Sequence, residues 1–129
     1  KGLQGKVVSG LREGRFFTML PWAREQFVSK LGIDPYPGTL NLKLDNVETL
    51  KEWERLKTLR GITIISPEGE NSCNAKCFKI LIQEKVSGAI VFPEVPSYPS
   101  DKLEIIADCN LKETLGIENG EIIQVDIVH

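Results

Sequence analysis

Short apolar segments of about four to seven residues recur along this chain of 129 residues, and glycine- or proline-containing turns separate them. The segments are Gly5–Ser9, Leu40–Leu44, Ile62–Ile65, Lys76–Ile82, Gly88–Phe92, Leu103–Ala107 and Ile122–Val128. They show no βαβ rhythm, heptad pattern or internal repeat. Many short strands of this kind avoid exposed sheet edges by closing into a barrel. The segments amount to six or seven short strands, and we predict a mainly β fold, a small six-stranded β-barrel with short helical insertions.

Apolar residues at helical spacing predict three short insertions between the strands. Pro21 suits the first position of a helix, and Gly32 suits the position just after its end. The predicted helices cover residues 22–31, 46–57 and 111–115.

Length and composition are those of one ordinary globular domain, which we expect to span residues 1–129. A net charge of −2 and a pI near 5.5 provide no long-range attraction to nucleic acid or to an anionic membrane. No apolar run approaches the roughly 20 residues that a transmembrane helix needs, and the first residues do not read as a signal peptide. The chain begins with Lys1, so residues could be missing upstream. We expect a monomer whose partners are small molecules.

The three cysteines, Cys73, Cys77 and Cys109, are an odd number and fit reduced thiols better than a disulfide framework. We therefore expect a cytoplasmic protein. Cys73 and Cys77 are separated by three residues, which is not the CxxC spacing of a zinc site.

The segment Pro35-Tyr36-Pro37-Gly38-Thr39-Leu40-Asn41-Leu42-Lys43-Leu44 begins as a rigid turn and continues as a strand. Alternation places the three leucines on one face and Thr39, Asn41 and Lys43 on the other. A hydroxyl and a carboxamide two residues apart are neutral oxygen ligands that suit a hard cation such as Mg²⁺. The alternative interpretation is a plain amphipathic strand whose polar face lies in solvent.

The segment Gly10-Leu11-Arg12-Glu13-Gly14-Arg15 is predicted to be a loop. Its glycines allow backbone N–H groups to turn towards an anion, and its arginines add bidentate donors for phosphate. An ordinary glycine turn with solvated charges is the alternative.

Familiar catalytic signatures are missing from the sequence. The single histidine is His129, at the end of the sequence, which gives little support for a Ser-His or Cys-His nucleophile pair. Neither a GxxxxGK[ST] loop nor a GxGxxG turn occurs, which excludes the standard P-loop and Rossmann nucleotide sites.

Four segments, taken together, resemble the archaeal-type, CTP-dependent riboflavin kinases over nearly the whole chain. The two specific ones are Val7-Val8-Ser9-Gly10-Leu11-Arg12-Glu13-Gly14-Arg15-Phe16-Phe17 and Pro35-Tyr36-Pro37-Gly38-Thr39-Leu40-Asn41-Leu42. Two weaker ones follow in the same order, namely Gly88-Ala89-Ile90-Val91 and Leu103-Glu104-Ile105-Ile106-Ala107, the latter with Asn110-Leu111-Lys112 after it.

The resemblance implies a cradle-loop β-barrel that transfers the γ-phosphoryl group of CTP to riboflavin, giving FMN. It implies that the nucleotide contacts Gly10, Leu11, Arg12, Glu13, Gly14 and Arg15 in the first loop and Cys109, Asn110, Leu111 and Lys112 in the last one. It also implies Mg²⁺ on Thr39 and Asn41, and flavin contacts from Ser97 and Glu104.

Two residues are expected to act in the transfer itself. Arg15 would neutralise charge on the phosphates, and Glu104 would orient or deprotonate the ribityl hydroxyl. By alternation, Glu104 shares a strand face with Ile106. A carboxylate beside an isoleucine suggests that this face lines the flavin cavity.

The loop before Tyr98 differs from the family pattern by one residue in length. Two positions also depart from that pattern, since Arg12 stands where a glycine is expected and Asp108 where a proline is expected. They keep open a flavin- or nucleotide-binding module without catalysis. A third possibility is a DNA-binding barrel regulator, against which the acidic balance of the chain argues.

Overall fold

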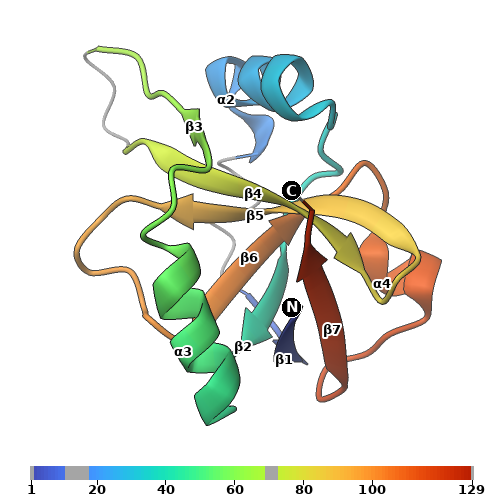
Figure 1. Ribbon diagram of the computed structural model, residues 1–129. Helices are drawn as coiled ribbons and strands as arrows, with labels where there is room; N and C mark the ends of the chain where they lie inside the picture. Colours follow the sequence, from blue (N-terminus) through green and yellow to red (C-terminus); the bar gives the residue numbers. More distant parts are fainter. Residues whose placement is uncertain (1, 11–17, 69–72, 129) are drawn as a thin grey trace.

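The computed structural model describes residues 2–10, 18–68 and 73–128 of the chain (Figure 1). Its strands are β1 (Gly2–Val8), β2 (Leu40–Lys43), β3 (Ile62–Ile64), β4 (Ala75–Ile82), β5 (Val86–Pro93), β6 (Lys102–Ile106) and β7 (Ile122–Ile127). Its helical elements are α2 (Pro21–Gln26), the π-helix η1 (Phe27–Leu31), α3 (Val47–Leu56) and α4 (Leu111–Leu115). None of these described helices is long and apolar enough to cross a membrane.

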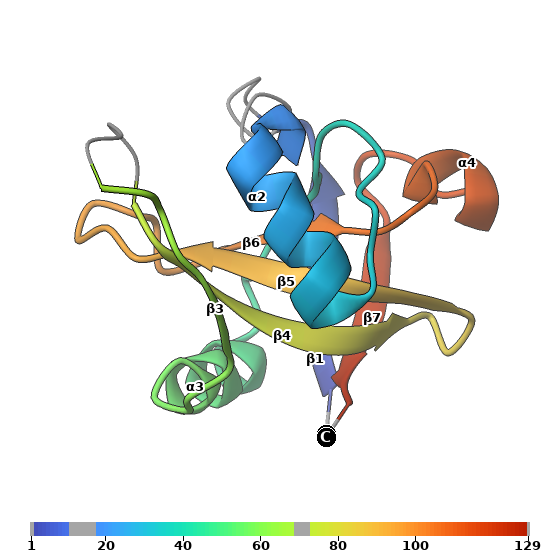
Figure 2. The same ribbon diagram turned by 90° about the horizontal axis from the view of Figure 1, so that it is seen from above.

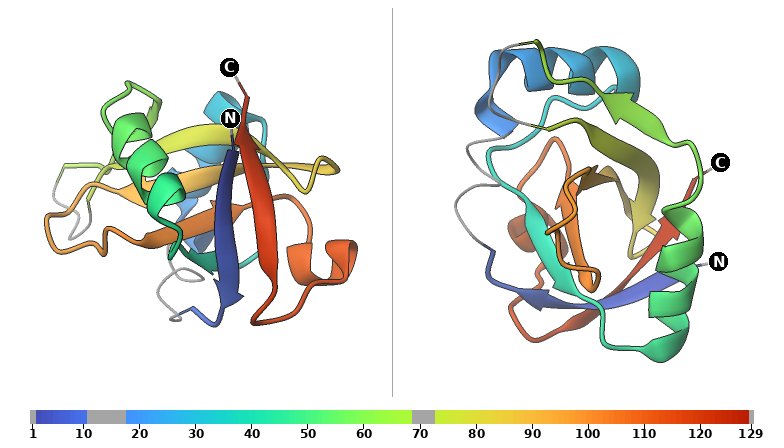
Figure 3. Two further views of the ribbon diagram at one scale, coloured as in Figure 1. Left: turned by 60° about the horizontal axis from the view of Figure 1, so that its bottom comes forward. Right: turned by 90° about the vertical axis from the view of Figure 1, so that its left-hand side faces the viewer.

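The strands follow one another in the order β3-β4-β5-β6-β2-β1-β7, and every neighbouring pair is antiparallel. An additional pairing of β4 with β7 closes six of these strands into a barrel. One edge of β4 pairs with two strands: residues 75–77 pair with β3, and residues 80–82 pair with β7. The right-hand view of Figure 3 shows the strands curving around a common centre. The predicted six-stranded β-barrel with short helices is confirmed.

The barrel interior is filled by side chains that alternate along each strand. Leu40, Leu42 and Leu44 are all buried in this core, as their spacing in the sequence predicts. Trp53 of α3 packs into the same core and meets the rings of Phe78 and Phe92 edge to face, with centroids 6.0 and 5.7 Å apart. Helix α3, which carries Trp53, therefore contributes to the core of the barrel.

A second, smaller core lies on the outside of the barrel. Ala23, Phe27 and Leu31 from α2 and η1 pack against Val91 of β5 and Ile106 of β6. Figure 2 shows these two helices crossing the β4–β5 ribbon on the side opposite α3. Since side chains alternate along a strand, Glu104 lies on the same outer face of β6 as Ile106.

Pro21 starts α2, as predicted, and Gly32 follows η1 with a φ of 72°, the left-handed conformation that glycine adopts without strain. The predicted second helix is also confirmed, and Asn46 caps it by accepting a hydrogen bond from the backbone N–H of Thr49 at 3.0 Å.

Candidate functional site

Strand pairing brings Asn41 and Glu104 together, although 63 positions separate them in the chain (104 − 41). The two are direct partners in the antiparallel ladder between β2 and β6. On its other side, Asn41 is paired with Val8 at the end of β1. Three strands therefore meet at this point, and Gly10 lies two residues after the end of one of them, β1.

Hydrogen bonds join Thr39, Asn41 and Glu104 into one polar cluster. The Thr39 hydroxyl donates to Oε1 of Glu104 at 3.1 Å. The Asn41 Nδ2 group donates to the backbone oxygen of Thr39 at 3.1 Å and to its Oγ1 at 3.3 Å. The residues expected to bind metal and the carboxylate expected to act on the acceptor thus occupy one site.

Asn41 is buried, with 5% of its surface exposed, which rules out the interpretation that its side chain lies in solvent. Among the described residues, its Oδ1 atom has no hydrogen-bond partner. A buried acceptor that lacks a donor costs about 1–3 kcal/mol, and a bound cation would supply the missing contact. Oδ1 of Asn41 and Oγ1 of Thr39 are the type of neutral oxygen that Mg²⁺ accepts beside phosphate ligands. The residues fit a cation here, and the Mg²⁺ itself stays a prediction.

Gly10 packs against this cluster. A methyl group built on its Cα would overlap the Asn41 carboxamide, so a larger residue at this position would displace that side chain. The remaining residues of the predicted phosphate loop, Leu11 to Arg15, lie outside the described residues, and so does His129.

Two side chains connect the start of that loop with the α4 segment. The Nδ2 group of Asn119 donates to Oγ of Ser9 at 2.8 Å. Its Oδ1 accepts a hydrogen bond from Nζ of Lys112, also at 2.8 Å. Ser9, which directly precedes the predicted phosphate loop, is therefore linked to Lys112 of the α4 segment through Asn119.

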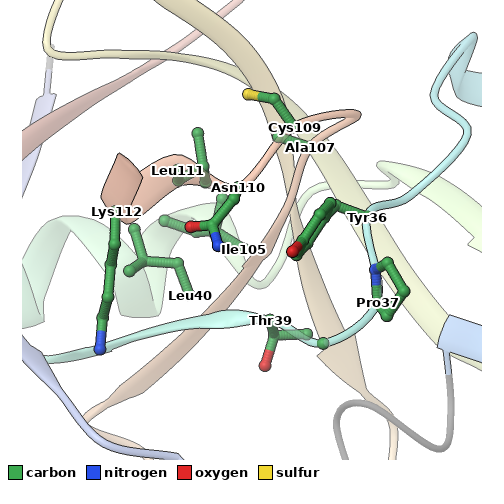
Figure 4. Close-up of a pocket in the computed structure, with 11 residues that line it drawn as sticks. Tyr36, Pro37, Thr39, Leu40, Ile105, Ala107, Cys109, Asn110, Leu111 and Lys112 are labelled. Carbon is green, nitrogen blue, oxygen red and sulfur yellow. The ribbon is translucent and has the colours of Figure 1, made fainter. Parts of the chain in front are cut away.

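A cavity of about 210 Å³ adjoins the polar cluster (Figure 4). The turn at residues 36–40 forms one wall, and residues 105, 107 and 109–112 form the other. The backbone N–H of Tyr36 donates to the carbonyl of Ala107 at 2.8 Å and ties the two walls together. Figure 4 shows Tyr36, Thr39 and Asn110 around this space. Cys109, Asn110, Leu111 and Lys112 thus line a cavity that shares Thr39 with the polar cluster.

The structure adds Tyr98, a residue that the sequence analysis did not select. Its hydroxyl donates to Oε2 of Glu104 at 2.6 Å. Burial, together with the hydrogen bond to Glu104 and its negative charge, raises the pKa of Tyr98 well above its usual range. Ser97, the residue selected for the flavin, is exposed in the same loop. A tyrosine between Pro96 and Pro99 was the available signal, since prolines restrict how such a loop can present its side chains.

Comparison with known proteins places the whole barrel in one family. The family model for CTP-dependent riboflavin kinases, which carries the description "Domain of unknown function DUF120", matches residues 7–127. A protein named riboflavin kinase from Archaeoglobus fulgidus is 40% identical over 128 residues, covering 98% of this chain and 54% of the relative. Riboflavin kinases from Methanocella arvoryzae and Pyrobaculum aerophilum are 39% and 41% identical, covering 97% and 98% of this chain and 56% and 60% of their own lengths. The chain thus spans just over half the length of these curated relatives.

Proposed function

Because this chain belongs to the family of CTP-dependent riboflavin kinases, we propose that it transfers the γ-phosphoryl group of CTP to riboflavin, giving FMN and CDP. The observation that supports this most directly is the meeting of Thr39, Asn41 and Glu104 at the edge of a cavity. Phosphoryl transfer needs positioned groups and charge neutralisation more than covalent chemistry from the protein.

In this proposal the nucleotide lies in the cavity between the 36–40 turn and the α4 segment. Lys112 supplies positive charge near the phosphates. The predicted phosphate loop at residues 10–15 would contact them as well, with Arg15 as the second cation. Thr39 and Asn41 would hold Mg²⁺, and a bound ion would supply positive charge to the phosphates of the nucleotide.

Glu104 would receive the acceptor. Its Oε1 accepts one hydrogen bond, from the Thr39 hydroxyl. A carboxylate oxygen can accept a second one, so an incoming ribityl hydroxyl can donate to the same oxygen. The hydroxyl oxygen forms a bond to the γ-phosphorus as the bond from that phosphorus to the β–γ bridging oxygen breaks. CDP leaves with the electron pair of the broken bond, and the proton of the hydroxyl passes to Glu104. Ser97 would contact the flavin from the neighbouring loop.

The remaining parts of the proposal concern the setting of the enzyme. A single kinase domain over residues 1–129 would act as a monomer on two small-molecule substrates. It would act in the cytoplasm, where Cys73, Cys77 and Cys109, which are free thiols in the structure, stay reduced.

The decisive experiment incubates the purified protein with riboflavin, Mg²⁺ and each of the four common nucleoside triphosphates, followed by chromatography for FMN. We expect FMN and CDP with CTP, and turnover with ATP at least about tenfold lower, because buried groups that pair with the cytosine edge stay unpaired with adenine. Reactions without protein and with excess chelator are the controls. Tight riboflavin and CTP binding without FMN in any reaction would instead identify a binding module without catalysis.

A further inference from the structure

We propose that Tyr98 is a positioning residue for the acceptor carboxylate: its hydroxyl fixes Glu104 so that the other carboxylate oxygen faces Thr39. This role rests on the proposed kinase reaction and adds to it a residue that does not itself take part in proton transfer.

The two oxygens of Glu104 have separate partners. Oε2 accepts from the Tyr98 hydroxyl at 2.6 Å, and Oε1 accepts from the Thr39 hydroxyl at 3.1 Å. An O–H···O⁻ bond of 2.6 Å has the length typical of strong, charge-assisted hydrogen bonds. Rotation of the carboxylate would break both bonds in a side chain that is only 14% exposed. Tyr98 therefore fixes the orientation in which the carboxylate presents an oxygen to Thr39 and the acceptor.

The ring of Tyr98 is itself held in place. It meets Phe92 edge to face, with centroids 5.8 Å apart, and Phe92 meets Trp53 of α3 in the same way at 5.7 Å. The ammonium group of Lys102 lies 5.6 Å from the centre of the Tyr98 ring. The backbone N–H of Tyr98 also closes a turn onto the carbonyl of Val95 at 3.1 Å. A hydroxyl fixed in this way can orient Glu104 without being reoriented by it.

The acid–base properties of Tyr98 agree with a positioning role. Burial and the neighbouring carboxylate raise its pKa, so the hydroxyl keeps its proton and stays a donor throughout the neutral pH range. Among the described residues, Lys102 is the cation paired with Glu104, but its Nζ lies 3.9 Å from Oε2 and is partly exposed, so solvent weakens its influence. Of these two groups near Oε2, the hydroxyl of Tyr98 is the closer and better directed.

Tyr98→Phe tests the role, because it removes the hydroxyl and keeps the ring between Phe92 and Lys102. We expect kcat for FMN formation to fall about tenfold or more, the scale for losing one hydrogen bond to a charged group. KM for CTP should stay within about twofold of the wild-type value, because a residue that acts through Glu104 makes no contact with CTP. Thr58→Val is the matched control, since it also deletes a hydroxyl with a 2.6 Å hydrogen bond, at the exposed end of α3. Its kcat should equal that of the wild type.

A double-mutant cycle with Glu104→Gln separates positioning from direct contact with substrate. If Tyr98 acts through Glu104, then Tyr98→Phe changes kcat by less than about twofold in the Glu104→Gln background. Multiplicative effects of the two substitutions, or an unchanged kcat in Tyr98→Phe alone, would overturn the role. A wild-type protein that makes no FMN with any nucleotide would overturn the proposed function, and the role of Tyr98 with it. A wild-type protein that turns over, combined with a multiplicative cycle, would overturn the role of Tyr98 alone.

Discussion

Gly10 and the carboxamide of Asn41 are packed so closely that no side chain fits between them. Gly10 is the first residue of the predicted phosphate loop, and Asn41 is a predicted metal ligand. Gly10 therefore lies directly against the carboxamide of the predicted metal ligand, so the position of each depends on the other. Close approach, and not an unusual turn, favours glycine here.

Gly10→Ala should displace the Asn41 carboxamide and lower FMN formation about tenfold or more, on the scale of one misplaced active-site group. Gly10 is exposed at the barrel rim, so the thermal midpoint of unfolding should change little. Steady-state kinetics with a Mg²⁺ titration would measure the effect. The control is the same substitution in an Asn41→Ala background, where the added methyl group meets no carboxamide and should cost no further activity. Equal losses in both backgrounds would contradict this relationship.

Asn41→Leu should separate stability from activity. Leucine has nearly the shape of asparagine. It removes a buried acceptor that has no partner among the described residues, but it also removes the two hydrogen bonds from Nδ2 to Thr39, so the free energy of unfolding should stay within about 1 kcal/mol of the wild type. FMN formation should fall about 100-fold or more, the scale for losing one transition-state contact. Thr39→Val tests the second ligand in the same way, with urea unfolding and the FMN assay measured side by side. If both variants keep wild-type rates at every Mg²⁺ concentration, Thr39 and Asn41 do not bind the metal.

The sequence predicted which way the side chains of β2 point but not how deeply they are buried. Alternation placed Thr39 and Asn41 opposite the leucines, and that arrangement is confirmed. The burial of Asn41 depends on pairing with β1 and on the approach of Gly10, which come from distant parts of the chain. Periodicity within one segment carries no information about such neighbours.

The strand face of Glu104 was predicted correctly, but the surroundings of its neighbour on that face, Ile106, were not. Ile106 is buried beneath α2 and η1, with Ala23 and Phe27, and does not line a flavin cavity. Glu104 lies two residues before Ile106, where β6 pairs with β2. Tyr98 was missed for a related reason, because its contact with Glu104 depends on the path of the 94–101 loop, which no periodic pattern encodes.

The three cysteines should differ in their reactivity. Burial raises the pKa of Cys77 to about 12, although the charge of Lys30 partly opposes the shift. Iodoacetamide at pH 8 should therefore modify the half-buried Cys73 and Cys109 in the folded protein and reach Cys77 only after unfolding. CTP should protect Cys109, which lines the cavity, and leave Cys73 reactive. Mass spectrometry of the labelled peptides would measure this, and labelling of Cys77 as fast as Cys73 would contradict the burial.

The same shift in pKa has a consequence for stability. A thiol in the unfolded chain ionises near pH 9, whereas Cys77 in the folded protein keeps its proton up to about pH 12. Between these values the folded state binds more protons than the unfolded state, so the free energy of unfolding should fall as the pH rises. Cys77→Ala should weaken this fall, and urea unfolding at pH 8 and pH 10 would measure the difference.

Glu104→Gln isolates the charge of the acceptor carboxylate. Its amide keeps the size of the side chain, so stability should stay within about 1 kcal/mol of the wild type, as for a near-isosteric change at a partly wet site. The amide oxygen can still accept from Tyr98 or Thr39, but the amide nitrogen cannot accept from the other hydroxyl or take a proton from riboflavin. Riboflavin binding, turnover or both should weaken, while CTP binding stays nearly intact, because the nucleotide cavity is lined by other residues. Titrating each ligand separately, by flavin fluorescence for riboflavin and by calorimetry for CTP, would measure the two effects. Unchanged riboflavin affinity together with unchanged turnover would return Glu104 to the role of a hydrogen-bonded strand carboxylate.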